Sequence, residues 1–193
     1  MFVFFDVGNV ILPRMPKHID NIAIAGHLKR NSITPALPLI HKLQRGELTE
    51  TEFWKKFKQC TGQLPKNYKT LWTESFTFST DKKVLAIAEN LRQKGIRTGI
   101  LSNTIAPHAK ILRAYGLYDG FEPVILSCEV KARKPEQKIY SIAAKKAGVS
   151  VQECVHIDDD AEFVKSAKAA GMDAILYKNP KQLTKELQKH RFL

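Results

Sequence analysis

The chain has 193 residues, of which 44% are hydrophobic, and it carries a formal net charge of +12 at pH 7. These values are typical of a soluble protein with one core and a modest insertion. No apolar run approaches the roughly 20 residues of a membrane-spanning helix, which argues against a membrane protein of that type and against a membrane partner.

The positive charge would attract phosphate groups, those of nucleic acids included. The 31 basic residues are spread through the chain, however, and the dense stretch Lys55–Lys58 has the pattern of a solvated helix face. The sequence contains no zinc-finger, basic-zipper or RNP-like motif, so a nucleic-acid partner is not expected. The absence of a visible signal peptide and three widely spaced cysteines predict free thiols in a reducing, cytoplasmic compartment.

The first predicted element is a strand over Phe2–Phe5, which ends at Asp6. This short apolar run shows no alternation, which is typical of a parallel strand covered on both faces. Asp6 then lies at the carboxyl end of that strand, where open α/β sheets bind their ligands. We therefore expect Asp6 to be a nucleophile, a metal ligand or both.

Residues 14–79 show apolar residues at helical spacing and no convincing strand. Within them, Thr49 and Glu52 form a capping-box signal, and the apolar residues Phe53, Trp54 and Phe57 follow it. The pattern predicts a small all-helical cap of about four helices, inserted after the first strand.

From residue 80 onward, helical and strand patterns alternate. Predicted strands lie around residues 99–101, 124–126, 155–157 and 174–177, and each is followed by a predicted helix. This alternation predicts an α/β fold, a doubly wound parallel sheet with helices on both faces. The core is expected to comprise residues 1–13 and 80–193, and the cap residues 14–79.

Polar side chains follow several of the predicted strands, and parallel strands bring their carboxyl ends to one edge of the sheet. Carboxylates gathered there repel one another, and a divalent cation together with a lysine would balance three of them. Because every candidate ligand is an oxygen, the hard ion Mg²⁺ is favoured, and a phosphate dianion would dock beside it. The candidate residues are Asp6, Ser102, Asn103, Lys134, Asp158 and Asp159.

These segments, taken together and in this order, resemble the motifs of the haloacid dehalogenase superfamily, which consists mostly of Mg²⁺-dependent phosphohydrolases with a Rossmann-like core. The segment Phe-Phe-Asp-Val-Gly-Asn-Val and residues 45–54 further resemble the subgroup with a C1-type helical cap, which includes bacterial sugar-phosphate phosphatases active on glucose 1-phosphate. The four matching segments are residues 4–10, 101–103, 134–135 and 157–159.

The resemblance implies a role for each candidate residue. Asp6 would attack phosphorus and form an aspartyl-phosphate, while Lys134 would neutralise the developing charge. Ser102 and Asn103 would bind the phosphoryl oxygens. The ligands of Mg²⁺ would be Asp6, the backbone carbonyl of Gly8, Asp158 and, directly or through a water molecule, Asp159. The substrate would be a small phosphorylated metabolite, and the acidic pair argues against the metal-free dehalogenase branch.

The sequence departs from the common family pattern at Gly8, where a second aspartate usually acts as general acid and base. Such a group typically contributes roughly 10²–10⁴-fold to the rate. Three explanations stay open: a substrate with a good leaving group, a water or cap residue that takes over the role, or a chain that binds phosphate and turns over poorly. The alternative functions are accordingly a catalytically weak phosphate-binding or regulatory protein and a basic nucleic-acid-associated protein.

Two histidines lie close to the candidate residues in the sequence. His108 follows the second motif and either faces the cap or lies on a helix surface, whereas His156 is expected to pack within the fourth strand.

Overall fold

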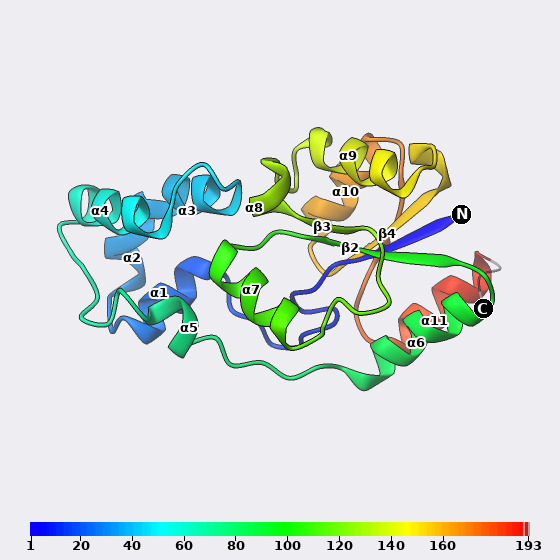
Figure 1. Cartoon of the computed structure of the whole chain (residues 1–193), viewed down its shortest axis with the longest axis horizontal. Helices are drawn as coiled ribbons and strands as arrows, with labels where there is room; N and C mark the ends of the chain where they lie inside the picture. The colour runs from blue at the N-terminus through cyan, green and yellow to red at the C-terminus, as the bar shows by residue number, and fades with distance from the viewer. Residues whose placement is uncertain (191, 193) are drawn as a thin grey trace.

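The computed structural model describes residues 1–190 and residue 192, so Arg191 and Leu193 of the predicted core lie outside the described residues. Within that part of the chain, the strands form one five-stranded sheet in the order β3-β2-β1-β4-β5, and every neighbouring pair is parallel (Figure 1). The predicted doubly wound α/β fold is therefore confirmed. The strands are β1 (Phe2–Phe5), β2 (Arg97–Ser102), β3 (Val124–Leu126), β4 (Cys154–Asp158) and β5 (Asp173–Leu176).

The strand β1 occupies the middle of the sheet, as its uninterrupted apolar run predicts. All four of its residues are fully buried, and it pairs with β2 on one side and β4 on the other. Val3 and Phe5 pack into the core on one face, whereas Phe2 and Phe4 pack into the core on the other. A strand covered on both faces needs apolar residues at every position, which explains the lack of alternation.

Helices cover both faces of the sheet (Figure 1). One face is packed by α6 (Lys82–Gln93), α7 (Ala106–Ala114) and α11 (Pro180–Lys189), and the other by α9 (Gln137–Ala147) and α10 (Ala161–Ala169). A short helix, α8 (Ser127–Val130), follows β3. The side chains of Asp81 and Asp160 accept hydrogen bonds from the first turns of α6 and α10, which is why these helices begin there.

Between β1 and α6 the chain forms a group of helices, which we call the helical insertion and define as residues 18–74. Its buried apolar side chains make a separate cluster, to which Ile105 of the sheet-bearing part also contributes. The capping box of Thr49 and Glu52 is present at the start of α4, with both reciprocal hydrogen bonds. The elements are α1 (His18–Ala25), α2 (Arg30–Ile33), a 3₁₀ helix (Thr34–Ala36), α3 (Leu37–Gln44), α4 (Glu50–Thr61) and α5 (Leu71–Glu74).

The insertion contacts the sheet-bearing part through the end of α3. Gly46 has a φ of +63°, and a side chain there would lie 2.2 Å from the carbonyl oxygen of Cys128, so only glycine fits this close approach. Beside it, Arg45 Nη1 donates to Glu136 Oε1 at 2.8 Å. These contacts hold the end of α3 against α8 and the start of α9. In the described part of the chain, none of the helices combines the length and apolar character needed to cross a bilayer.

Candidate functional site

Three carboxylates meet at the carboxyl edge of the sheet. Asp6 directly follows β1, Asp158 is the last residue of β4, and Asp159 comes next. The register pairs Phe5 with Ile157, which sets the two strand ends side by side, and the amide of Asp6 donates to the carbonyl of Ile157 at 2.9 Å. One carboxylate oxygen from each aspartate lies within 4.8 Å of the others.

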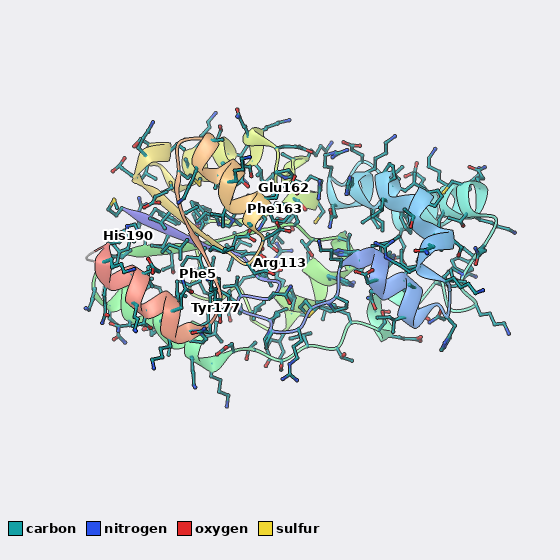
Figure 2. All side chains as sticks on the ribbon, turned by 180° about the vertical axis from the view of Figure 1, so that it is seen from behind. Phe5, Arg113, Glu162, Phe163, Tyr177 and His190 are labelled. Atoms are coloured by element: carbon teal, nitrogen blue, oxygen red, sulfur yellow. The ribbon has the colours of Figure 1, made fainter. Side chains whose placement is uncertain are left out.

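Lys134 reaches this cluster from the segment that precedes α9. Its Nζ donates to Asp6 Oδ1 at 2.8 Å, to Asp158 Oδ2 at 2.5 Å and to the carbonyl of Leu101 at 3.1 Å. The side chain is fully buried, and its ammonium lies 5.2 Å from the ring centre of Phe163. Figure 2 shows Phe163 near the start of α10, next to Glu162. A buried ammonium of this kind is stable only because its charge is paired.

The protonation of these groups reflects burial and charge together. Burial raises the pKa of Asp6 to about 7, against the opposing effect of Lys134 and with the help of Asp158. Burial also acts to raise the pKa of Asp158, but Lys134 and a hydrogen bond from His156 outweigh it and hold that pKa below its usual range. Burial, followed by the charge of Asp158, raises the pKa of Asp159. The positive charge of Lys134 therefore only partly compensates the negative charge of the three carboxylates.

This arrangement fits a divalent cation. With the three aspartates ionised and one ammonium present, a net charge near −2 remains at the edge of the sheet. The ligands on offer are carboxylate oxygens, which Mg²⁺ prefers. A bound cation would also favour the ionised form of Asp6, because it lowers the cost of the buried negative charge.

Two asparagines position the site residues. Asn9 adopts a left-handed backbone conformation with a φ of 57°, its Nδ2 donates to Asp159 Oδ2 at 3.1 Å, and its Oδ1 accepts from the amide of Met15 at 2.8 Å. Asn103 forms two hydrogen bonds with the backbone of Lys134, at 2.8 and 2.9 Å. Asn103 therefore ties the loop after β2 to the segment that carries the lysine.

The remaining candidate residues also lie at this edge. Ser102 is the last residue of β2 and is buried, one residue before Asn103. A Cβ atom built on Gly8 would meet only Asp6 Oδ2 and the Cβ of Met15, each at 4.0 Å, so the position accepts a Cβ atom without a clash. The phosphate-binding roles of Ser102 and Asn103 and the metal-ligand role of the Gly8 carbonyl stay predictions.

The structure places both histidines in the interior. His156 is fully buried in β4, as expected, and its Nε2 lies 2.9 Å from Asp158 Oδ2, a contact that the strand pattern did not reveal. His108 is buried rather than on a helix surface: its ring stacks on Phe76, and its Nε2 lies 3.0 Å from the carbonyl oxygen of Trp72. Asn9 was not among the residues predicted from the sequence, although it lies within the first of the matching segments, residues 4–10.

Comparisons with known proteins show which family the chain resembles. A family model described as haloacid dehalogenase-like hydrolase matches residues 2–171. Among curated proteins, the chain is 33% identical over 90 residues to "Phosphatase MT3486" of Mycobacterium tuberculosis, covering 46% of this chain and 42% of that protein. It is 34% identical over 90 residues to the "Glyceraldehyde 3-phosphate phosphatase" of Methanothermobacter thermautotrophicus, covering 45% and 39%. The chain thus aligns with less than half the length of these two relatives.

A solved structure is similar over nearly the whole chain. The HAD family enzyme bt-2542 of Bacteroides thetaiotaomicron is 25% identical, with a TM-score of 0.74, and the match covers 92% of this chain and 93% of that one. The same enzyme has been solved in complex with magnesium and inorganic phosphate, and that structure matches with a TM-score of 0.72 at 25% identity. A predicted HAD-like hydrolase of Porphyromonas gingivalis, 20% identical with a TM-score of 0.77 over 98% of this chain and 96% of that one, shares the fold.

Proposed function

The chain belongs to the haloacid dehalogenase-like hydrolases, and we propose that it is a Mg²⁺-dependent phosphatase acting on a small phosphate monoester. The observation that carries this proposal is the meeting of Asp6, Asp158 and Asp159 with the buried Lys134 at one edge of the sheet. The magnesium and phosphate complex of the similar bt-2542 enzyme supports it.

Asp6, Asp158, Asp159 and the carbonyl of Gly8 would hold the Mg²⁺ ion. When bound, the ion supplies positive charge that draws a phosphate to the site and stabilises the negative charge that builds up during phosphoryl transfer. Lys134 contributes further positive charge from its buried position, together with the hydrogen bonds that orient Asp6 and Asp158. Preorganised charge of this kind is the main expected source of rate enhancement.

The reaction would begin with Asp6. Lys134 holds Asp6 Oδ1, which leaves Oδ2 to attack phosphorus. An aspartyl-phosphate forms as the bond from phosphorus to the ester oxygen breaks, and the departing alkoxide takes a proton from water. Ser102 and Asn103 would bind the phosphoryl oxygens, and because the side chain of Asn103 already holds Lys134, its backbone amide is the natural donor. Water would then hydrolyse the intermediate and release phosphate.

A sugar phosphate or a related small metabolite is the proposed substrate. The motif Phe-Asp-Val-Gly-Asn-Val and the helical insertion resemble the subgroup with C1-type caps that includes phosphatases of glucose 1-phosphate. Curated relatives carry the names "Glyceraldehyde 3-phosphate phosphatase" and "Fructose-1-phosphate phosphatase YqaB", the latter from Escherichia coli and 36% identical over 66 residues.

The first test is a phosphatase assay with and without metal. We expect phosphate release from a panel of sugar phosphates and phenyl phosphate in Mg²⁺, and a fall of at least roughly 10³-fold after exhaustive treatment with EDTA, because the carboxylates then lack their counter-charge. Restoring Mg²⁺ should restore the rate, whereas Ca²⁺, which prefers more ligands, should support little turnover. Equal turnover in EDTA would refute the metal-dependent mechanism.

Gly8 gives a second test, because a Cβ atom fits at this position, where the common family pattern has an aspartate. Gly8→Asp should increase kcat by roughly 10²-fold or more on esters with poor leaving groups, which is the lower end of the roughly 10²–10⁴-fold contribution of general acid–base catalysis. Gly8→Asn is the matched control, because it adds the same bulk without a titratable group. If kcat rose in neither variant, the site would not need the missing acid.

Gly8 also favours one other function, a phosphate-binding protein with weak turnover. In that case, isothermal titration would detect Mg²⁺-dependent binding of inorganic phosphate while phosphate release from every ester stayed at background. Gly8→Asp would then be the variant expected to bring turnover above background.

A further inference from the structure

His18 lies where three segments from the carboxyl edge of the sheet meet the helical insertion. It is the first residue of α1 and follows the loop that begins at Asp6. Its ring stacks on His108 of α7, with ring centres 5.2 Å apart, and α7 follows the Ser102 loop. Arg133 directly precedes Lys134 and is connected to His18 by hydrogen bonds through Gln44, the last residue of α3. The His18 side chain therefore lies at the junction of the insertion with the segments that lead from Asp6, Ser102 and Lys134.

Hydrogen bonds fix the tautomer of His18. The Nε of Arg133 can only donate, and it lies 2.9 Å from Gln44 Oε1, so the amide orientation of Gln44 is determined. The amide nitrogen Nε2 of Gln44 then donates to His18 Nδ1 at 3.2 Å. Because Nδ1 accepts this hydrogen bond, the ring proton of neutral His18 lies on Nε2.

This Nε2–H group is enclosed but has no hydrogen-bond partner within residues 1–190 and 192. Burial and then the charge of Arg133 lower the pKa of His18 to about 4, so the ring is neutral near pH 7. The indole Nε1 of Trp72, whose ring centre is 6.0 Å from that of His18, and the indole Nε1 of Trp54, whose ring stacks on that of Trp72, are also enclosed donors without a partner. Buried donors are nearly always satisfied in folded proteins, so three unsatisfied ones in adjoining rings indicate an acceptor that the chain itself does not supply.

Resting on the proposed phosphatase function, we propose that His18 binds the organic part of the substrate, with its Nε2–H donating to a hydroxyl or carbonyl oxygen. A neutral donor suits an uncharged oxygen, whereas the charged phosphoryl group would be bound by the cation that the carboxylates hold and stabilised by the charge of Lys134. Loss of such an acceptor leaves a buried donor unpaired, which selects against substrates that lack it. The site would thus prefer polyol and sugar phosphates over aryl phosphates.

The test compares two substitutions of His18 by amides of different length. His18→Asn keeps a polar group near Nδ1, where Gln44 donates, but removes the distal donor; His18→Gln places an amide N–H near the position of Nε2. We measure the ratio of kcat/KM for the best ester of a sugar-phosphate panel to kcat/KM for phenyl phosphate. His18→Asn should lower this ratio by roughly 10- to 100-fold, and His18→Gln should recover most of the loss.

His27→Asn serves as the matched control, because His27 is an exposed histidine of the same insertion. Its backbone has a φ of 52°, which asparagine tolerates, so the substitution should leave the ratio as in the parent. The inference is overturned if His18→Asn changes both rates by the same factor, or if the parent prefers phenyl phosphate to every sugar phosphate.

Long-range ¹H–¹⁵N spectra of the imidazole rings provide a readout that does not depend on activity. They should show the Nε2–H tautomer of His18, and an Nδ1–H tautomer would contradict the proposed hydrogen-bond chain. The two proposals fail differently: no Asp6-dependent turnover of any ester refutes the phosphatase function, whereas turnover of phenyl phosphate without an effect of His18→Asn on the ratio refutes only the role of His18.

Discussion

Replacing Asp6 with asparagine should reduce Mg²⁺-dependent turnover by roughly 10³-fold or more, as expected when a nucleophile is removed. The amide oxygen of the variant can still accept the hydrogen bond from Lys134, which Asp6 Oδ1 accepts at 2.8 Å in the parent. The side-chain volume hardly changes, so the fold should persist. What is lost is the carboxylate that would attack phosphorus and share in metal binding.

The measurement is phosphate release with a sugar-phosphate panel and phenyl phosphate, alongside thermal unfolding of each variant. Asp160→Asn is the matched control: Asp160 is the N-cap of α10, its side chain accepts from the amide of Glu162, and asparagine caps helices about as well as aspartate. This control should retain turnover. If Asp6→Asn retained turnover as well, another group would have to be the nucleophile.

Lys134→Met should impair both activity and folding. The substitution leaves Asp6 and Asp158 buried without their ammonium partner, and removing one member of a buried ion pair typically costs roughly 3–5 kcal/mol. Urea unfolding in EDTA should show this loss, and Mg²⁺ should restore part of it by supplying positive charge. Turnover should fall by roughly 10²-fold or more, comparable to the loss of an electrostatic stabiliser of the transition state.

The pH dependence of stability should change in a defined direction. In the parent, Lys134 and His156 hold the pKa of Asp158 below its usual range, so the stability contributed by Asp158 is present above its unfolded pKa and lost as pH falls through the lower folded value. Without Lys134 the folded pKa of Asp158 rises, so the variant should lose that contribution at a higher pH.

Lys138→Met is the matched control for this variant, because Lys138 is an exposed lysine of α9. It should match the parent in turnover and in the acid limb of its stability curve. Parent-like unfolding of Lys134→Met in EDTA would mean that the two carboxylates are protonated in the metal-free protein and do not need the lysine.

The sequence by itself determined the sheet and the gathering of the candidate residues. The unbroken apolar run Phe2–Phe5 required a strand covered on both faces, and β1 is indeed central. Because parallel strands place their carboxyl ends at one edge, Asp6 and Asp158 had to be neighbours once both strands were recognised. The start of α4 was also predictable, because the capping box of Thr49 and Glu52 depends only on residues within a single helix turn.

Only the tertiary structure decided how the side chains around those residues are paired. Lys134 donates hydrogen bonds to Asp6, 128 residues away in the chain, and to Asp158, 24 residues away. Its backbone amide donates to the side chain of Asn103. The contact of Arg133 with Gln44, 89 residues apart, depends on how α3 packs against the loop before α9. Strand periodicity specifies a backbone position, but the pairing of long side chains depends on packing between distant segments, and that is why the enclosed Nε2 of His18 could be found only in the folded chain.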